Sequence, residues 1–419
     1  MQSDAALERF DKLRLKTVTE DHSVSTLLAE FQSTAASLEP DERIELEAAY
    51  PREGVELSKA VLADPQANKI CSLVWWYDGK EDVNSIIPLL VNNCPELASL
   101  AVRLTRHSAF DFVSSMLEHP SNKIKVLEVP TDTKGDLARF FAALGQSQVS
   151  AITLSLGNSY EFYQRLCEYL AKDLLVRLKV TMSHMQVPPE MMMSLAKCTR
   201  LTVLVLSRCK FPQSVLITFP KFITKLKLSQ CWFAAGMDWS FLADSSVREL
   251  DFSNMRGVDG NLLGRGLAVH LRAKGLDKLC LRDCGFTNLI LDAIGIELGR
   301  IGRLDIGNLN DAFLAQIVLV LQSPNNEIKE LVLGYTSLTM SSIENLLVPA
   351  LKHSNCNLVK LSLWTYLSED QTAAKTIEHK FRNRLALFAL LQGQQVRRWY
   401  CPLRRLPVEM LRLAGQMLM

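Results

Sequence analysis

The chain has 419 residues and a formal net charge of +2, and 48% of its residues are hydrophobic while 22% are charged. This composition excludes a disordered chain and is ample for a continuous apolar core. No run of about 18 apolar residues occurs, which argues against a membrane span. The start Met1-Gln2-Ser3-Asp4 lacks the basic and apolar segments of a signal peptide. We therefore expect a cytoplasmic protein, or one delivered to a host cytosol if it is an effector.

The cysteines and histidines do not form a chemical site. The ten cysteines have no paired framework, and most lie within apolar strand patterns, where a reduced thiol acts as a small hydrophobe. The seven histidines are dispersed, and no Cys/His cluster has the spacing of metal ligands. The glycine-rich stretch Gly257 to Gly266 lacks the Lys-Ser/Thr of a phosphate loop. We therefore expect no enzymatic activity, no metal and no cofactor.

Residues 1–51 have apolar spacing typical of helices. One helix is expected near Ser23 to Ala36 and another through Asp41 to Ala49. Because the first repeat of a stacked array exposes its core unless it is covered, these residues predict a helical N-terminal cap.

From residue 52 to residue 370 an apolar-x-x-apolar-x-apolar pattern recurs. Its copies begin at Ile70, Leu97, Ile124, Val149, Leu175, Leu201, Ile223, Val247, Leu276, Ile301, Ile328 and Leu358. The central apolar residue advances from Leu73 to Leu361 in eleven steps, a mean near 26 residues. Alternation of period two is followed by helical spacing, as in 83–91, 110–117 and 137–144. Each copy therefore predicts a strand and then a helix, stacked on its neighbours.

Two intervals depart from the mean spacing. The interval of 22 residues from Leu204 to Leu226 contains two prolines, which predicts an extended or 3₁₀ connection in place of a full helix. The interval of 29 residues that ends at Leu279 contains four glycines within 257–266. These glycines predict a looser loop before a helix near Leu267 to Ala273.

Cysteines mark the ends of several strands. Cys209, Cys231 and Cys284 each follow the third apolar residue of their motif copy, with two residues in between, where a buried thiol can satisfy backbone groups of the turn. With the apolar spacing, they resemble the leucine-rich-repeat family, in its cysteine-containing and ribonuclease-inhibitor-like forms and as found in ubiquitin-ligase substrate receptors. The resemblance covers roughly residues 52–370. It implies an α/β solenoid, a horseshoe with a parallel concave sheet and outer helices, that binds proteins.

Residues 371–419 are basic, with a net charge of +7 over 372–419. Their helical periodicity predicts a C-terminal cap. An alternative interpretation is an adaptor segment, because Leu406, Pro407, Glu409 and Leu411 resemble the opening of an F-box, and a Leu-Pro pair also occurs in SOCS-type boxes. Lys and Arg alternate here with core-like residues and do not cluster with stacking aromatics, so nucleic acid is not the expected ligand.

The non-core strand positions point into the predicted concave face, where we expect the protein-binding site. The candidate residues are Trp76, Tyr77, Arg177, Lys179, Arg208, Lys225, Lys227, Glu249, Asp251, Lys278, Arg282, Asp305, Tyr335 and Trp364. Parallel strands place equivalent residues about 5 Å apart, so two rows of alternating charge are expected: Lys225-Glu249-Lys278 and Arg303-Glu330-Lys360. Mutual compensation and a complementary binding site are alternative interpretations of these rows. Exposed Trp and Tyr are the usual anchors of interfaces.

Three functions fit these patterns. The first is an intracellular protein-binding scaffold, a monomer with a protein partner of unknown identity and no membrane partner, of which an effector is one form. The second is a substrate receptor that binds ubiquitin-ligase components through residues 406–411. The third is a GTPase-activating repeat protein, which would use Arg103 or Arg106 at the N-terminal rim.

Overall fold

The computed structural model describes most of the repeat array. The described residues are 24–37, 44–50, 54–77, 83–104, 109–129, 135–156, 159–182, 185–212, 219–234, 236–307, 309–336, 338, 340–351, 353, 355–365, 375, 377–379 and 382. The chain divides into two compact units, Met1–Leu206 and Ser207–Met419, each of which is described by itself.

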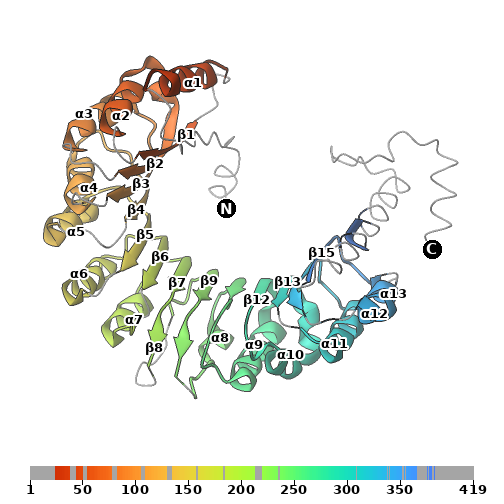
Figure 1. Cartoon of the computed structure of the whole chain (residues 1–419). Helices are drawn as coiled ribbons and strands as arrows, with labels where there is room; N and C mark the ends of the chain where they lie inside the picture. The colour runs from red at the N-terminus through yellow and green to blue at the C-terminus, as the bar shows by residue number, and fades with distance from the viewer. Residues whose placement is uncertain are drawn as a thin grey trace, which may run out of the picture. The chain divides into compact units, whose positions relative to one another are not determined.

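Unit 1 alternates strands with helices (Figure 1). Its strands are β1 (Ile44–Tyr50), β2 (Ile70–Tyr77), β3 (Ser99–Leu104), β4 (Val126–Val129), β5 (Ala151–Leu156), β6 (Arg177–Met182) and β7 (Val203–Ser207), the last of which ends at the first residue of unit 2. Its helices are α1 (Val24–Ser37), α2 (Gly54–Ala63), α3 (Ile87–Asn93), α4 (Ala109–Glu118), α5 (Leu137–Gln146), α6 (Tyr160–Leu170) and α7 (Pro189–Ala196), with 3₁₀ turns η1 (Pro65–Lys69) and η2 (Val83–Ile86). Strands β1 to β6 pair in parallel in chain order.

Unit 2 repeats the pattern with shorter strands at its start. Its main strands are β9 (Lys225–Ser229), β11 (Glu249–Asp251), β12 (Leu276–Leu281), β13 (Ile301–Gly307), β14 (Glu330–Thr336) and β15 (Lys360–Thr365), and they too pair in parallel in chain order. Strands β8 (Lys210–Phe211) and β10 (Trp232–Phe233) form a separate two-stranded sheet. The helices are α8 (Phe241–Asp244), α9 (Gly260–Lys274), α10 (Thr287–Ile294), α11 (Asp311–Gln322), α12 (Met340–Ser342) and α13 (Val348–Leu351), with the 3₁₀ turn η3 (Gly295–Arg300) and the π-helical turn η4 (Ile343–Leu347).

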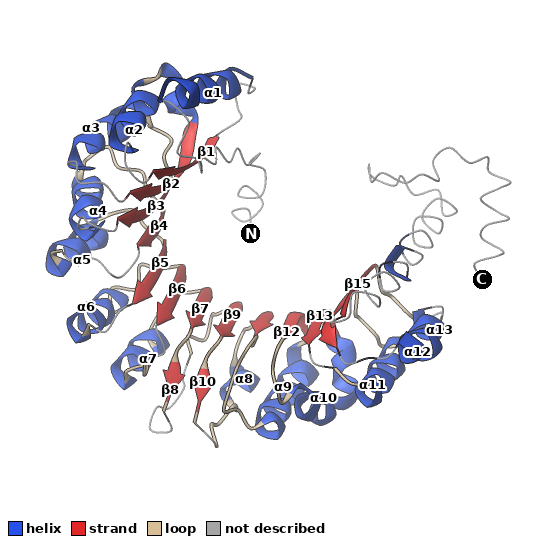
Figure 2. Ribbon diagram, viewed as in Figure 1, coloured by secondary structure: helices blue, strands red, loops and turns tan. Residues whose placement is uncertain are grey.

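The repeat pattern accounts for the core of both units. All twelve repeat-start residues and all twelve central residues are at most 4% exposed. The parallel register aligns the central residues, for example Leu226 with Leu250 and Leu250 with Leu279, so that each unit buries one continuous apolar row. The described helices of each unit lie on one face of its strands (Figure 2). This α/β leucine-rich-repeat fold with a parallel sheet confirms the predicted fold class.

The N-terminal region contains a strand that the helical expectation missed. The helix predicted near Ser23 to Ala36 is present as α1. The helix predicted through Asp41 to Ala49 is wrong, because Ile44–Tyr50 forms β1 and pairs in parallel with β2. Ile44 and Leu46 are buried on the same side of β1, which is period two and the signature of a strand. The sheet therefore begins before residue 52.

The glycine-rich interval folds as a helix, so the loop predicted for Gly260 to Gly266 is wrong. Helix α9 already begins at Gly260. A Cβ on Gly264 would lie 2.6 Å from the Cβ of Ala293 in α10, and a Cβ on Gly266 would lie 2.8 Å from the carbonyl oxygen of Trp239. These glycines let α9 approach its neighbours closely, which outweighs their cost in helix propensity of about 1 kcal/mol each.

In the short interval from Leu204 to Leu226, residues 213–218 lie outside the described residues, and the rest agrees with the predicted extended connection. Its described residues contain the two-residue strand β8 in the place of an outer helix.

None of the helices in the described ranges is both long enough and apolar enough to cross a membrane.

Candidate functional site

The face of the sheet opposite the helices carries several of the predicted site residues in each unit. In unit 1, Arg177 and Lys179 alternate with buried residues along β6, and both are exposed. In unit 2 we use the name charged face for the polar side chains of consecutive strands from β9 to β15. They are Lys225, Lys227, Glu249, Asp251, Lys278, Arg282, Arg303, Asp305, Glu330 and Lys360.

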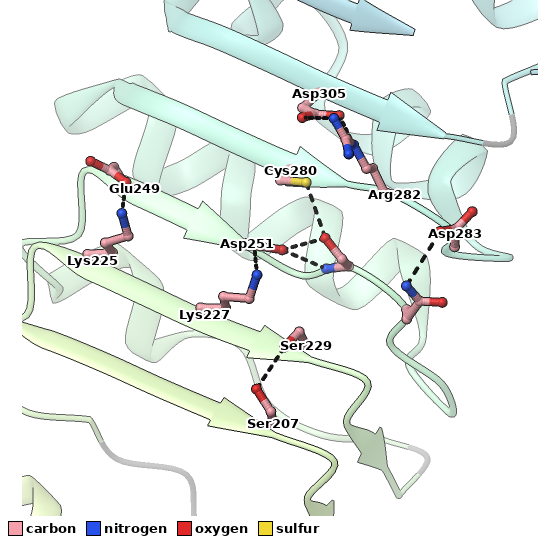
Figure 3. A network of polar contacts seen from close by, with 12 residues as sticks. Ser207, Lys225, Lys227, Ser229, Glu249, Asp251, Cys280, Arg282, Asp283 and Asp305 are labelled. Carbon is pink, nitrogen blue, oxygen red and sulfur yellow. Dashed lines mark hydrogen bonds and ion pairs between the residues drawn. The ribbon is translucent and has the colours of Figure 1, made fainter. Parts of the chain in front are cut away.

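Two ion pairs connect β9 to β11 (Figure 3). The parallel register sets Lys225 opposite Glu249 and Lys227 opposite Asp251. Nζ of Lys225 lies 2.8 Å from a carboxylate oxygen of Glu249, and Nζ of Lys227 lies 2.7 Å from one of Asp251. The first step of the predicted row Lys225-Glu249-Lys278 is thereby confirmed.

Asp251 is engaged on both carboxylate oxygens. One oxygen faces Lys227, and the other accepts hydrogen bonds from the backbone N–H of Ser253 at 3.1 Å and from its hydroxyl at 2.5 Å. Burial acts to raise the pKa of Asp251, but the hydrogen bonds from Lys227 and Ser253 outweigh it and hold that pKa below its ordinary value. The hydroxyl of Ser253 also lies 3.2 Å from Sγ of Cys280. Asp251 therefore has little bonding capacity left for a partner.

Arg282 and Asp305 form a bidentate pair that the sequence did not predict. Nε and a terminal nitrogen of Arg282 donate to the two oxygens of Asp305 at 2.5 and 2.8 Å, and this pairing raises the pKa of Arg282 (Figure 3). The prediction that Asp305 is an exposed partner contact is wrong, because Asp305 is 2% exposed. The strand register places Asp305 opposite Cys280, so Arg282 reaches it diagonally from two residues further on. A rule that matches equivalent positions cannot find such a pair.

The second predicted row is present. Arg303 lies 3.0 Å and Lys360 lies 3.8 Å from the same oxygen of Glu330. Lys278 differs from these residues. The register places it between Glu249 and Arg303, yet Lys278 makes no ion pair in the described part of the chain. The first predicted row therefore ends at Glu249.

Arg208 lies in a turn after β7 rather than on the sheet face. It has a left-handed backbone with φ of 57°, and its Nε donates to the side-chain oxygen of Gln230 at 2.8 Å. Gln230, Asn254 and Asp283 have positive φ at the same place in the following repeats. This turn directs the next residue of each repeat into the core.

The cysteines after these turns act as the sequence predicted. Cys209, Cys231 and Cys284 are at most 1% exposed. Their thiols donate to the backbone carbonyls two residues earlier at 3.4, 3.5 and 3.4 Å, and Cys284 also reaches the carbonyl of Phe252 at 2.9 Å. Burial raises the pKa of Cys284 to about 12, so this thiol is neutral and structural.

The remaining candidate residues are placed only by their backbones or lie outside the described residues. Trp76 and Tyr77 belong to β2, Tyr335 to β14 and Trp364 to β15, and Arg103 in β3 is the register partner of Trp76. Arg106, Leu406, Pro407, Glu409 and Leu411 lie outside the described residues. The adaptor segment therefore stays a prediction.

The charged face is arranged for polar recognition. Within the described ranges, no group of three His, Cys, Asp or Glu side chains could hold a metal ion. Burial raises the pKa of Cys280, the thiol on this face, which keeps it protonated. What the face offers a ligand is a set of charges held in place by their mutual bonds.

Comparisons with known proteins concern the fold. No protein-family model matches the chain, and no curated protein matches it in sequence. The solved structure of TLR13 in complex with the single-stranded RNA ssRNA13 is similar, with 13% identity and a TM-score of 0.43 over 79% of this chain and 43% of that one. The plant peptide hormone receptor RGFR1 in complex with RGF2 has 11% identity and a TM-score of 0.28 over 78% of this chain and 60% of that one. The chain thus spans less than two thirds of either protein's length, and the ligands are those of the two receptors.

Proposed function

We propose that the chain is a protein-binding repeat scaffold, without catalytic activity, that recognises an acidic region of its partner on the face of the sheet opposite the described helices. The single observation that carries this proposal is the position of Lys278. Lys278 is the register partner of Arg303, so two cations stand on adjacent strands about 5 Å apart.

Neighbouring like charges on a sheet destabilise it unless something compensates them. Arg303 is paired with Glu330 at 3.0 Å. Lys278 makes no ion pair in the described part of the chain, because the carboxylate of its other register partner, Glu249, is engaged by Lys225 at 2.8 Å. A carboxylate from a partner would fit between the two cations. The surrounding ion pairs hold the strand side chains in place, so little conformational entropy would be lost on binding.

Unit 1 offers similar free cations. Arg177 and Lys179 are exposed on β6, their register partners on β5 are Ala151 and Thr153, and neither cation makes an ion pair among the residues that the structure describes. Such uncompensated cations on an ordered sheet are suited to steering and holding an acidic protein surface.

The test is affinity purification with the full chain, comparing wild type with Lys278→Glu and with Arg177→Glu/Lys179→Glu. We expect the charge-reversed variants to lose the main partner, while Lys278→Arg, which keeps the charge, retains it. Recovery of the same partner by all variants would overturn the assignment of the site. Recovery of a cullin adaptor that deletion of residues 393–419 abolishes would instead support a ubiquitin-ligase receptor, and recovery of a small GTPase would support a GTPase-activating protein.

A further inference from the structure

Three neighbouring repeats of unit 2 place a tryptophan between two cations at the ends of their turns. Trp232 in β10 pairs in parallel with Lys210 in β8, and a further parallel bridge joins Trp232 to Arg256. We call Lys210, Trp232 and Arg256 the basic tryptophan strip. It lies beyond the strand ends and is separate from the charged face.

The backbone of the strip is held by hydrogen bonds between the three repeats. The backbone N–H of Trp232 donates to the carbonyl oxygen of Cys209 at 2.8 Å, and the backbone N–H of Arg256 donates to the carbonyl oxygen of Cys231 at 2.9 Å. Side chains alternate along β8 and β10, so Phe211 and Phe233 point inward and stack with ring centres 4.6 Å apart. The outward positions are thus fixed on a buried aromatic base.

Trp232 is a preorganised anchor. It is 46% exposed, which is unusual for so large an apolar side chain. Gly257 has a φ of +73°, and a Cβ there would lie 3.3 Å from Nε1 of Trp232 and would collide with the carbonyl oxygen of Phe233. The indole therefore lies against a backbone that only glycine provides. Exposed tryptophans of fixed orientation are the residues that contribute most to protein interfaces.

The cations of the strip are available to a ligand. Lys210 and Arg256 are exposed, and neither side chain makes an ion pair or a hydrogen bond in the described part of the chain. Arg208, two residues before Lys210, is exposed and uses only its Nε, toward Gln230. The neighbouring segment 213–218 contains no charged residue. Within the residues that the structure describes, the cations of the strip are therefore left without carboxylate partners.

We propose that the basic tryptophan strip binds an extended acidic segment of a protein partner, which places an apolar residue on Trp232 and a carboxylate at each cation. Two strand spacings separate Lys210 from Arg256, about 10 Å, and the side chains of an extended peptide that share one face, at positions i, i+2 and i+4, span about 13 Å. The long side chains of the two cations cover the difference. The segment should therefore carry Asp or Glu at positions i and i+4 with an apolar residue at i+2, so that all three side chains face the strip. A nucleic acid fits less well, because tracking a phosphate backbone needs a longer run of cations and several stacking aromatics.

The test uses synthetic nine-residue peptides in a Gly/Ser background, with two Glu residues two to six positions apart and Leu, Phe or Ala between them. Binding of fluorescein-labelled peptides to the full chain is measured by polarisation. We expect the tightest binding at a spacing of four, and none for the same peptides with Gln in place of Glu. Lys210→Glu/Arg256→Glu and Trp232→Ala should each weaken binding by at least about tenfold, while Trp232→Phe retains most of it.

The matched control is Lys221→Glu, a charge reversal at an exposed lysine that makes no ion pair within the described ranges. It should leave binding unchanged, and far-UV circular dichroism should give equal melting temperatures for all variants. The proposal is overturned if no acidic peptide binds better than its Gln counterpart, or if the strip variants bind as wild type does. It is also overturned if a labelled single-stranded RNA 12-mer binds and loses affinity in the strip variants while the peptides do not bind.

Discussion

Replacing Arg282 with alanine should destabilise unit 2 more than breaking any exposed ion pair on the same face does. The substitution leaves the carboxylate of Asp305, whose side chain is 4% exposed, without its bidentate partner. Breaking a fully buried pair in this way costs about 3–5 kcal/mol. Because the Arg282 side chain is 42% exposed and Arg303 stays 3.8 Å from Asp305, we expect a loss of about 2–3 kcal/mol in the free energy of unfolding.

Two companion variants show where the cost arises. Asp305→Asn removes the buried charge and leaves the guanidinium of Arg282 partly in water, so it should cost only about 1 kcal/mol. Lys225→Ala breaks a pair whose partners are 45% and 39% exposed, and should cost less than about 1 kcal/mol. The order of destabilisation is therefore Arg282→Ala, then Asp305→Asn and Lys225→Ala.

The assay is urea unfolding followed by far-UV circular dichroism, with the double variant Arg282→Ala/Asp305→Asn completing a cycle. The double variant should be more stable than Arg282→Ala alone, because the unpaired carboxylate is gone. If Arg282→Ala costs no more than Lys225→Ala, or if the double variant recovers nothing, Asp305 does not depend on Arg282 as the geometry indicates.

Three further outcomes follow from the packing. Gly264→Ala should cost about 1–3 kcal/mol, because its Cβ would lie 2.6 Å from that of Ala293, whereas Gly285→Ala, whose Cβ meets nothing within 4 Å, should melt as wild type does. His270 is fully buried, with Nδ1 and Nε2 at 2.7 and 2.9 Å from two backbone carbonyls, and burial lowers its pKa below 6.5 despite these carbonyls. As the pH falls, His270 therefore becomes protonated in the unfolded chain before it does in the folded chain, so the free energy of unfolding should decrease below about pH 6.5. The variant His270→Gln, which has no imidazole to protonate, should show a smaller difference in melting temperature between pH 7.5 and 5.5. Cys284, with its pKa raised to about 12, should resist iodoacetamide at pH 8 in the folded chain and react in urea, which mass spectrometry would detect; equal labelling in both states would show that the thiol is accessible.

The sequence alone determined the repeat, the identity of its core and the cysteines of its turns. Burial of an apolar row every 26 residues or so needs only local spacing, since each unit contacts its neighbours in order along the chain. The same spacing placed Lys225 beside Glu249 and Arg303 beside Glu330, because parallel strands set equivalent residues side by side.

Only the tertiary structure decided the contacts that do not follow equivalent positions. The stretch 44–50 has too few residues for its period to be read alone, and its pairing with β2 makes it a strand. Gly264 reads as a loop residue until α10 lies against it. Asp305 reads as an exposed charge until Arg282 crosses to it diagonally. In each case the deciding neighbour lies in another repeat, at a distance that depends on side-chain packing rather than on spacing along the chain.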